Sequence, residues 1–317
     1  MKRLLPDNAL YMTDGGLETT LIFHEGIDLP YFAAFDLLKD EAGTEYLRAY
    51  YRRYAEIARR FRLGLVLESP TWRANRDWAE KLGYDRAALA EANRKGVALM
   101  HEIRSMYASP LTPMLVSGNI GPRGDGYRVD KRMTAEQARD YHAEQIATFA
   151  DCGVDLVSVF TMNYVEEAIG VALAAREAGV PAVISFTLET DGRLPSGATL
   201  KQAIEETDAA SGGYPAHYMI NCAHPTHFDF VLEPGAPWME RIRGLRANAS
   251  RRSHAQLDEA TDLDAGNPDE LGGEYRLLKP LLPKLAVVGG CCGTDHRHVA
   301  SICAALAPRA EAMPRAA

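Results

Sequence analysis

The sequence predicts an α/β fold built as one (β/α)8 TIM barrel over residues 1–317, and three observations support this prediction. Short apolar runs alternate with helix-like stretches from one end of the chain to the other, as in proteins made of parallel βα units. No Ser- and Pro-rich linker and no block of charge divides the chain in two. The length of 317 residues also suits a single barrel, since such barrels commonly reach about 250 residues or more.

Eight candidate strands supply the barrel. Each is a short apolar run that is bounded by polar or turn-forming residues. In chain order they cover residues 10–13, 63–68, 113–117, 155–160, 182–188, 217–221, 242–245 and 285–288.

Start and stop signals support the helices between these strands. Thr134 followed by Gln137 has the form of a capping box, which predicts a helix over residues 135–150. A helix over 165–178 ends at Gly179, and a last helix is expected over 295–306. The polar and glycine-rich stretch 251–274 is predicted to be a long loop near the barrel mouth, and 309–317 a flexible tail.

Charge and cysteine content narrow the classes of function. The chain has 43 acidic and 35 basic residues and a net charge of -8, so it repels nucleic acid backbones and anionic membranes, and neither is an expected partner. Its five cysteines are an odd number, and the N-terminal stretch lacks the apolar run of a signal peptide. We therefore expect a cytoplasmic setting with reduced thiols.

Unusual polar and glycine-rich clusters follow five of the predicted strands. In a (β/α)8 barrel the chemistry lies at the C-terminal ends of the strands, so these clusters mark the expected site. They are Asp14-Gly15-Gly16, Glu68-Ser69-Pro70-Thr71, residues 117–122, Asn221-Cys222, and Gly289-Gly290-Cys291-Cys292-Gly293.

The adjacent pair Cys291 and Cys292 is the sharpest chemical signal. Neighbouring residues of a strand point to opposite faces, so two adjacent cysteines can share a target only where the strand has ended and the backbone turns. The flanking glycines permit such a turn. The helix that follows would place its N-terminal amides near the thiolates and lower their pKa.

A third cysteine, Cys222, ends the sixth predicted strand, on the same rim as the vicinal pair. Three thiolates could therefore converge on one Zn²⁺, which binds cysteine sulfur at about 2.3 Å and keeps a fourth position open when three protein groups bind it. Such a site would hold an incoming thiol as an electron-rich thiolate. Cys152 and Cys303 are better explained as core residues. His224 and His227 are alternative metal ligands, but polar histidines in loops more often face water or a backbone carbonyl.

These motifs, in this order, resemble the homocysteine S-methyltransferase family over nearly the whole chain. The family implies a zinc-bearing (β/α)8 barrel that transfers a methyl group to the thiol of homocysteine and forms methionine. Its partners are then a small-molecule thiol and a methyl donor. The motifs are Asp14-Gly15-Gly16, Glu68-x-x-Thr71-Trp72, residues 118–122, Asn221-Cys222 and residues 289–294.

The resemblance also implies roles for single residues. The zinc ligands, which are also the catalytic residues, would be Cys222, Cys291 and Cys292. The remaining positions would bind substrate or support the metal: Asp14, Gly15, Gly16, Glu68, Thr71, Trp72, Phe160, Thr161 and Asn221.

One position departs from the family pattern. Relatives place a Glu followed by Thr or Tyr at the end of the fourth strand to bind the substrate ammonium group, and here the corresponding pair is Phe160-Thr161. The missing carboxylate removes a charge-assisted hydrogen bond worth about 1.5 to 3 kcal/mol. Either Glu68 or Glu189 receives the ammonium, or the acceptor is a different thiol or a selenol.

The expected donor is a sulfonium compound, S-methylmethionine or S-adenosylmethionine, whose positive charge could face Trp72 or Phe160. Betaine is an alternative that Arg73 and Thr161 disfavour, because betaine users resemble one another in aromatic residues there. Outside this family, a metallohydrolase and a thiol redox or metal-storage module are the competing hypotheses.

Overall fold

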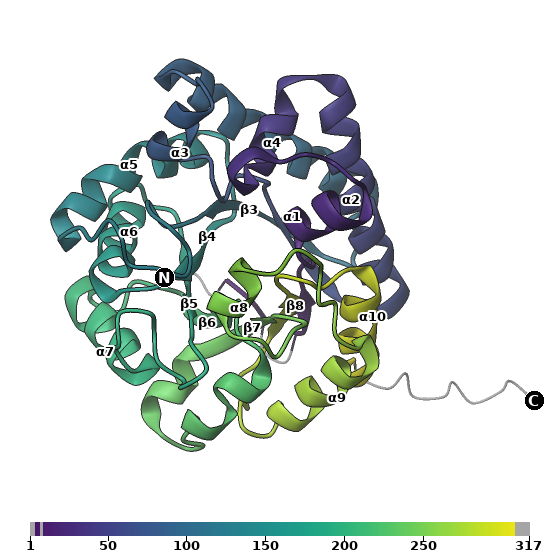
Figure 1. Cartoon of the computed structure of the whole chain (residues 1–317), viewed down its shortest axis with the longest axis vertical. Coiled ribbons are helices and arrows are strands. Elements are labelled where there is room, and N and C mark those ends of the chain that lie inside the picture. Colours follow the sequence, from purple (N-terminus) through teal and green to yellow (C-terminus); the bar gives the residue numbers. More distant parts are fainter. Residues whose placement is uncertain (1–3, 7–8, 308–317) are drawn as a thin grey trace, which may run out of the picture.

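A computed structural model describes residues 4–6 and 9–307 of the chain and confirms the predicted barrel. Eight parallel strands form a closed sheet in the order β1 to β8, and β1 pairs with both β2 and β8. Helices surround the sheet, and the strands meet at the centre of the view in Figure 1. The predicted tail at 309–317 lies outside the described residues.

The strands agree with the apolar runs of the sequence, with shifts at their ends. β3 and β4 run on beyond the predicted limits, and β8 begins later and includes Gly289 and Gly290 of the glycine-rich motif. The strands are β1 (Tyr11–Met12), β2 (Gly64–Glu68), β3 (Met114–Ile120), β4 (Leu156–Met162), β5 (Ala182–Thr187), β6 (His217–Asn221), β7 (Ile242–Ala247) and β8 (Val287–Gly290).

Ten α-helices lie in the described part of the chain: α1 (Leu17–Thr19), α2 (Glu41–Phe61), α3 (Arg76–Lys81), α4 (Arg86–Tyr107), α5 (Ala135–Asp151), α6 (Val165–Glu177), α7 (Leu200–Ser211), α8 (His254–Asp258), α9 (Pro268–Leu278) and α10 (His296–Leu306). The capping box of Thr134 and Gln137 is present at the start of α5. Short 3₁₀ turns cover Pro30–Phe32, Ala34–Lys39, Pro225–His227, Asp229–Val231 and Pro237–Arg241, and Thr20–His24 is a π-helix.

The prediction of a long loop over 251–274 is wrong. This segment contains α8 and the first turns of α9. Ser253 and Gln256 form a capping box at the start of α8, and Asn267 caps α9, which has Pro268 at its first position. Both signals are standard helix starts, and they outweigh the polar, glycine-rich composition of the segment.

Two apolar layers stabilise the barrel and position the rim formed by the C-terminal ends of its strands. One layer fills the space between the strands and the surrounding helices. The other includes Val66, Leu156, Val183 and Met219, which lie on alternate strand positions and fill the barrel interior. Because strand side chains repeat with a period of two, the same rows continue upward to polar residues, from Val66 to Glu68 and from Met219 to Asn221.

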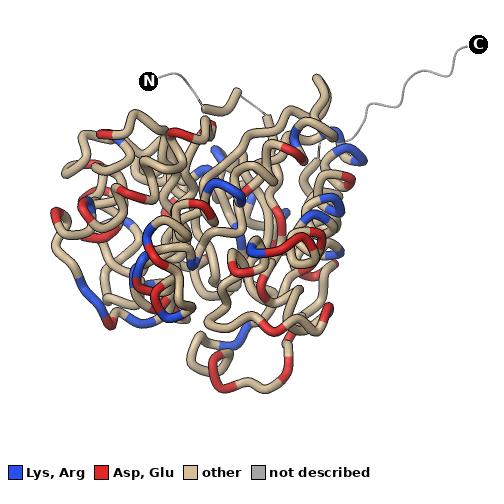
Figure 2. The backbone as a smooth tube through the Cα atoms, turned by 90° about the horizontal axis from the view of Figure 1, so that it is seen from above, with Lys and Arg blue, Asp and Glu red and all other residues tan. Residues whose placement is uncertain are grey.

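Charge of both signs is spread around the described backbone, as Figure 2 shows. Among the residues that the structure describes, none of the helices combines the length and the apolar composition needed to cross a membrane.

Candidate metal centre and substrate pocket

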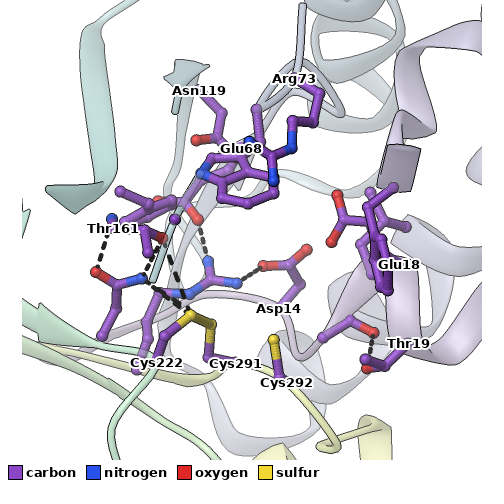
Figure 3. Close-up of a pocket in the computed structure, with 18 of the residues that line it drawn as sticks. Asp14, Glu18, Thr19, Glu68, Arg73, Asn119, Thr161, Cys222, Cys291 and Cys292 are labelled. Atoms are coloured by element: carbon purple, nitrogen blue, oxygen red, sulfur yellow. Dashed lines mark hydrogen bonds and ion pairs between the residues drawn. A yellow bond between two sulfur atoms is a disulfide. The ribbon is translucent and has the colours of Figure 1, made fainter. Parts of the chain in front are cut away.

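The three cysteine sulfurs that the sequence singled out converge at the C-terminal end of the barrel. Cys222 follows β6, and Cys291 and Cys292 follow β8. Their sulfur atoms all lie within 4.8 Å of one another, and Figure 3 places them side by side on the floor of the pocket. The positions of strand ends on one rim, rather than nearness in sequence, bring these groups together.

Two of the sulfurs, those of Cys222 and Cys291, form a disulfide, while Cys292 is a free thiol. A cysteine in a disulfide cannot act as a thiolate ligand. The disulfide and a three-thiolate metal site are therefore alternative states of the same residues, and reduction is required before a metal can bind all three.

The backbone is turned at two positions of this site. Cys222 has φ +53° and Thr161 has φ +62°, in the left-handed region that residues other than glycine seldom adopt. The Cys222 carbonyl accepts hydrogen bonds from Asn248 Nδ2 at 3.0 Å and His254 Nε2 at 2.6 Å. These buried bonds hold the strained turn, and such strain is frequent at functional sites.

Polar groups surround the sulfurs in a way that suits thiolates. Asn221 Nδ2 donates to Cys222 Sγ at 3.2 Å, and the Tyr127 hydroxyl lies 3.3 Å from Cys292 Sγ. The Asn221 side-chain oxygen accepts from the backbone N–H of Thr161 and fixes the orientation of the amide. A set of three sulfurs with donors directed at two of them fits a thiophilic ion such as zinc.

Burial raises the pKa of the Cys292 thiol, contrary to the expectation that α10 would lower it. The helix does begin just after the glycine turn, at His296. Desolvation of the thiolate is the larger influence here, and the Tyr127 hydrogen bond opposes it only in part.

The sulfurs lie in a pocket that most of the predicted substrate residues also line. Thr71 is the exception, because it is fully buried behind the wall, where its hydroxyl bonds to Asn119 O and Ser69 Oγ. The predicted residues that line the pocket are Asp14, Gly15, Gly16, Glu68, Trp72, Phe160, Thr161, Asn221 and the three cysteines.

A buried arginine that the sequence analysis did not single out occupies the centre of this wall. Arg246, from β7, pairs with Asp14 at 2.7 Å and with Glu68. Its guanidinium carbon lies 4.7 Å from the centre of the Phe160 ring. Burial raises the pKa of Asp14, and it raises the pKa of Glu68 to about 8, although Arg246 lowers both.

A second arginine, Arg73, packs between two indoles. Its guanidinium carbon lies 4.1 Å from the Trp72 ring centre and 4.0 Å from that of Trp78. Its terminal nitrogen donates to Gly124 O at 2.9 Å, and its Nε is buried without a hydrogen-bond partner. Burial lowers the pKa of Arg73 to about 10, so it is still a cation at neutral pH.

The histidines that could compete as ligands are bound elsewhere. His224 Nε2 pairs with Glu274 at 3.1 Å, and His227 Nε2 lies 2.9 Å from the Arg251 carbonyl oxygen. Among the described residues the cluster suited to a metal consists of the three cysteines alone.

Cys152, Cys303 and Glu189, which the sequence analysis also considered, lie outside the cysteine cluster. Cys303 is fully buried in the core, as expected, and Cys152 is half-buried at the end of α5. Glu189, a candidate for binding ammonium, pairs with His254 at 2.9 Å instead.

Arg246, Tyr127 and Glu18 are pocket residues that the sequence analysis did not identify. Arg246 is the second-last residue of β7, and its partner Glu68 is 178 residues away. Tyr127 lies in the loop after β3, and Glu18 lies in the short helix α1. Arginine at a strand end could have drawn attention to Arg246, because charged residues are seldom placed inside a barrel without a partner.

Comparisons with known proteins agree with this geometry. A family model described as Homocysteine S-methyltransferase matches residues 11–306. Homocysteine S-methyltransferase 4 of Zea mays is 25% identical, and the match covers 93% of this chain and 89% of that protein. Methionine synthase of Mycobacterium tuberculosis is 26% identical over 71% of this chain, which corresponds to only 19% of its own length.

Solved structures show the same fold. The oxidized form of the homocysteine methyltransferase MmuM from Escherichia coli has a TM-score of 0.73 at 20% identity, covering 93% of this chain and 95% of that one. Its metallated form has a TM-score of 0.69 at 21% identity, covering 96% and 98%. With the family model matched over most of its length, this methyltransferase belongs to the homocysteine S-methyltransferase family.

Proposed function

We propose that the chain is a zinc-dependent enzyme that transfers a methyl group from a sulfonium donor to the thiol of homocysteine and forms methionine. The single observation that carries this proposal is the convergence of Cys222, Cys291 and Cys292 in one pocket. When bound there, zinc supplies a Lewis acid that keeps the acceptor thiol deprotonated at neutral pH. An all-sulfur ligand set argues against a metallohydrolase, which needs a more Lewis-acidic ion.

The residues around the sulfurs have defined tasks in this proposal. Asn221 and Tyr127 donate hydrogen bonds to two of the sulfurs and so orient the ligands. The Thr161 hydroxyl accepts a hydrogen bond from Asn221 Nδ2 at 3.0 Å, which links this hydrogen-bond network to β4. Together these residues hold the site rigid, so that acceptor and donor meet in a fixed geometry.

The proposed reaction is a direct displacement at carbon. The acceptor thiol releases its proton to water, its sulfur forms a bond to the methyl carbon, and the bond between that carbon and the donor sulfur breaks. The electron pair of the broken bond remains on the donor, which leaves as a neutral thioether. Alignment of the two sulfurs with the methyl carbon supplies much of the rate enhancement.

The charge of the pocket favours a cationic donor. Five carboxyl groups and two guanidiniums line it, so even with Glu68 protonated the acidic groups outnumber the cations and attract a sulfonium ion. The Arg73 guanidinium covers one face of the Trp72 ring, and the Arg246 guanidinium covers one face of the Phe160 ring. A sulfonium could therefore contact only the other face of each ring.

A second candidate is methylation of a different thiol or selenol. Its support is Phe160 together with the Arg246 cluster, since Asp14 and Glu68 are already paired within the protein. An acceptor without an ammonium group would not need either carboxylate.

Product analysis with labelled donors tests the proposal. Reduced, zinc-loaded protein is incubated with homocysteine and trideuteromethyl-labelled S-methylmethionine, S-adenosylmethionine or betaine, and the products are identified by mass. We expect labelled methionine with a sulfonium donor and not with betaine. Cys222→Ser, Cys291→Ser and Cys292→Ser are expected to lose both zinc and turnover.

Cys152→Ser is the matched control, because this cysteine lies at the end of α5, away from the metal-binding cluster. It should keep one zinc per chain and normal turnover. Full zinc occupancy without methionine from any donor would overturn the choice of acceptor. Zinc retention in all three cysteine variants would overturn the metal site.

A further inference from the structure

The two carboxylates nearest the expected ammonium site are not available to a ligand. Arg246 pairs with both Asp14 and Glu68, and it also donates to the carbonyl oxygens of Gly15 and Gly290 at 3.1 Å. All three charged side chains are buried. Displacing Arg246 to admit an ammonium would leave a buried cation unpaired, which is strongly unfavourable.

Glu18 is a pocket carboxylate without a cationic partner. It lines the same cavity from α1, its carboxylate accepts a hydrogen bond from its own backbone N–H, and none of the ion pairs among the described residues includes it. Figure 3 shows the carboxylate directed toward the centre of the cavity, on the same side as Arg73. A partly buried carboxylate in this state lacks the cation that would stabilise it.

Arg73 is the complementary group, a pocket guanidinium without a carboxylate. Its side chain is 7% exposed, its Nε has no partner, and none of the ion pairs of the described residues includes it. The two flanking indoles hold the guanidinium plane in place. A planar, pre-oriented donor with unused hydrogen-bonding capacity is suited to a carboxylate.

We propose that Glu18 and Arg73 form the recognition pair for the α-amino-acid group of a substrate, with Glu18 binding the ammonium and Arg73 the carboxylate. The inference rests on the proposed function, because homocysteine, S-methylmethionine and S-adenosylmethionine all carry this group. It assigns the binding of ammonium to α1 in place of the Glu that is missing at the end of β4, and it favours an amino-acid acceptor over the second candidate.

The remaining pocket carboxylates fit this role less well. Asp125 Oδ1 already accepts the backbone N–H groups of Tyr127 and Arg128 at 2.8 and 3.1 Å. Asp258 is exposed to solvent on α8, where water weakens a charge interaction. Asp258 is therefore the matched control for Glu18.

Binding of stable thioethers tests the pair without any turnover. L-methionine is compared with 4-(methylthio)butanoate, which lacks the ammonium, and with 3-(methylthio)propylamine, which lacks the carboxylate. The reduced full-length protein is titrated by calorimetry as wild type, Glu18→Gln, Arg73→Gln and Asp258→Asn. Arg73→Lys keeps the positive charge and reports whether the charge alone is sufficient.

We expect wild type to prefer L-methionine over both analogues by about tenfold or more, the size of one charge-assisted hydrogen bond. Glu18→Gln should weaken L-methionine to the level of the butanoate and leave the butanoate unchanged. Arg73→Gln should weaken L-methionine and leave the propylamine unchanged. Asp258→Asn should match wild type.

Equal affinity of wild type for the three ligands would overturn the pair, as would loss of discrimination in Asp258→Asn but not in Glu18→Gln. These binding results are independent of methyl transfer, so failure of the proposed function is recognised separately by missing methionine. Where turnover is present, an increase in KM for homocysteine alone in Glu18→Gln assigns the pair to the acceptor. An increase for S-methylmethionine alone assigns it to the donor.

Discussion

At the scale of single residues, Arg246 explains how two acidic side chains can be buried next to each other. Burial raises the pKa of Asp14 and of Glu68, and the charge of Asp14 raises the pKa of Glu68 further. The guanidinium between them lowers both pKa values. Without this cation, the two carboxylates could ionise only at a large cost in free energy.

Replacing Arg246 by methionine should therefore lower the free energy of unfolding by about 3 kcal/mol or more, the usual effect of removing one partner of a buried ion pair. The measurement is urea unfolding of the reduced protein near pH 7. Arg132→Met is the control, since Arg132 pairs with Glu166 on the surface, and should change the free energy by no more than about 1 kcal/mol. Equal effects of the two substitutions would contradict a central role for Arg246.

The predictability of the site also differs from residue to residue. Cys291 and Cys292 could be identified from sequence because an adjacent pair framed by glycines has no packing explanation. Arg246 could not, because its role depends on partners that only the closed barrel brings to it. Glu18 resembles any acidic residue in a first helical turn, and only the structure reveals that its carboxylate faces a cavity.

At the scale of elements, apolar runs predicted all eight strands, including β7 (Ile242–Ala247), whose apolar run is weak. Strand ends were less predictable, since the polar residue Asn119 continues the pairing of β3 with β4, and β4 resumes its pairing with β5 at Met162 after an irregularity. The helix starts at Ser253 and Asn267 were present in the sequence but short. Composition was the wrong guide there, because capping is decided by single residues.

The turn after β8 has a requirement for glycine that can be tested. Gly293 has φ +78°, and a Cβ there would lie 2.9 Å from the Asp264 carbonyl oxygen. Gly83 has nearly the same conformation, φ +81°, with open space around it. Gly293→Ala should therefore lose about 1 kcal/mol or more of stability because alanine is strained in the left-handed backbone region, and it should lose more through the steric clash. Movement of the turn to relieve the clash should disturb the neighbouring Cys292.

The comparison of Gly293→Ala with Gly83→Ala separates these two effects. Both variants should lose stability in urea unfolding, and Gly293→Ala should lose more. Only Gly293→Ala should also reduce the zinc content of the reduced protein, measured by atomic emission. Normal zinc binding by Gly293→Ala would show that the site tolerates movement of this turn.

At the scale of the whole molecule, the reactive groups lie at the C-terminal end of the barrel, and the interior below them has a structural role. The interior contains a histidine, His217, which begins β6 and lies beside Met219 and Val183 below the pocket. It is buried, and its Nε2 has no hydrogen-bond partner among the described residues. Closing eight strands around this point leaves little water to solvate a charged imidazole.

This buried histidine should make the fold sensitive to acid. Burial lowers the pKa of His217 to about 3 from the ordinary value of 6.5, and Arg243 and Arg241 contribute in the same direction. Between these two values the unfolded chain binds a proton that the folded chain does not, so the free energy of unfolding falls as the pH falls. Between pH 7 and pH 5, the free energy of unfolding measured in urea should fall with pH more steeply for wild type than for His217→Gln. The difference between the two slopes should be up to about 1.4 kcal/mol per pH unit. His296→Gln, which changes an exposed histidine, should keep the wild-type slope, and equal slopes for wild type and His217→Gln would contradict the assignment.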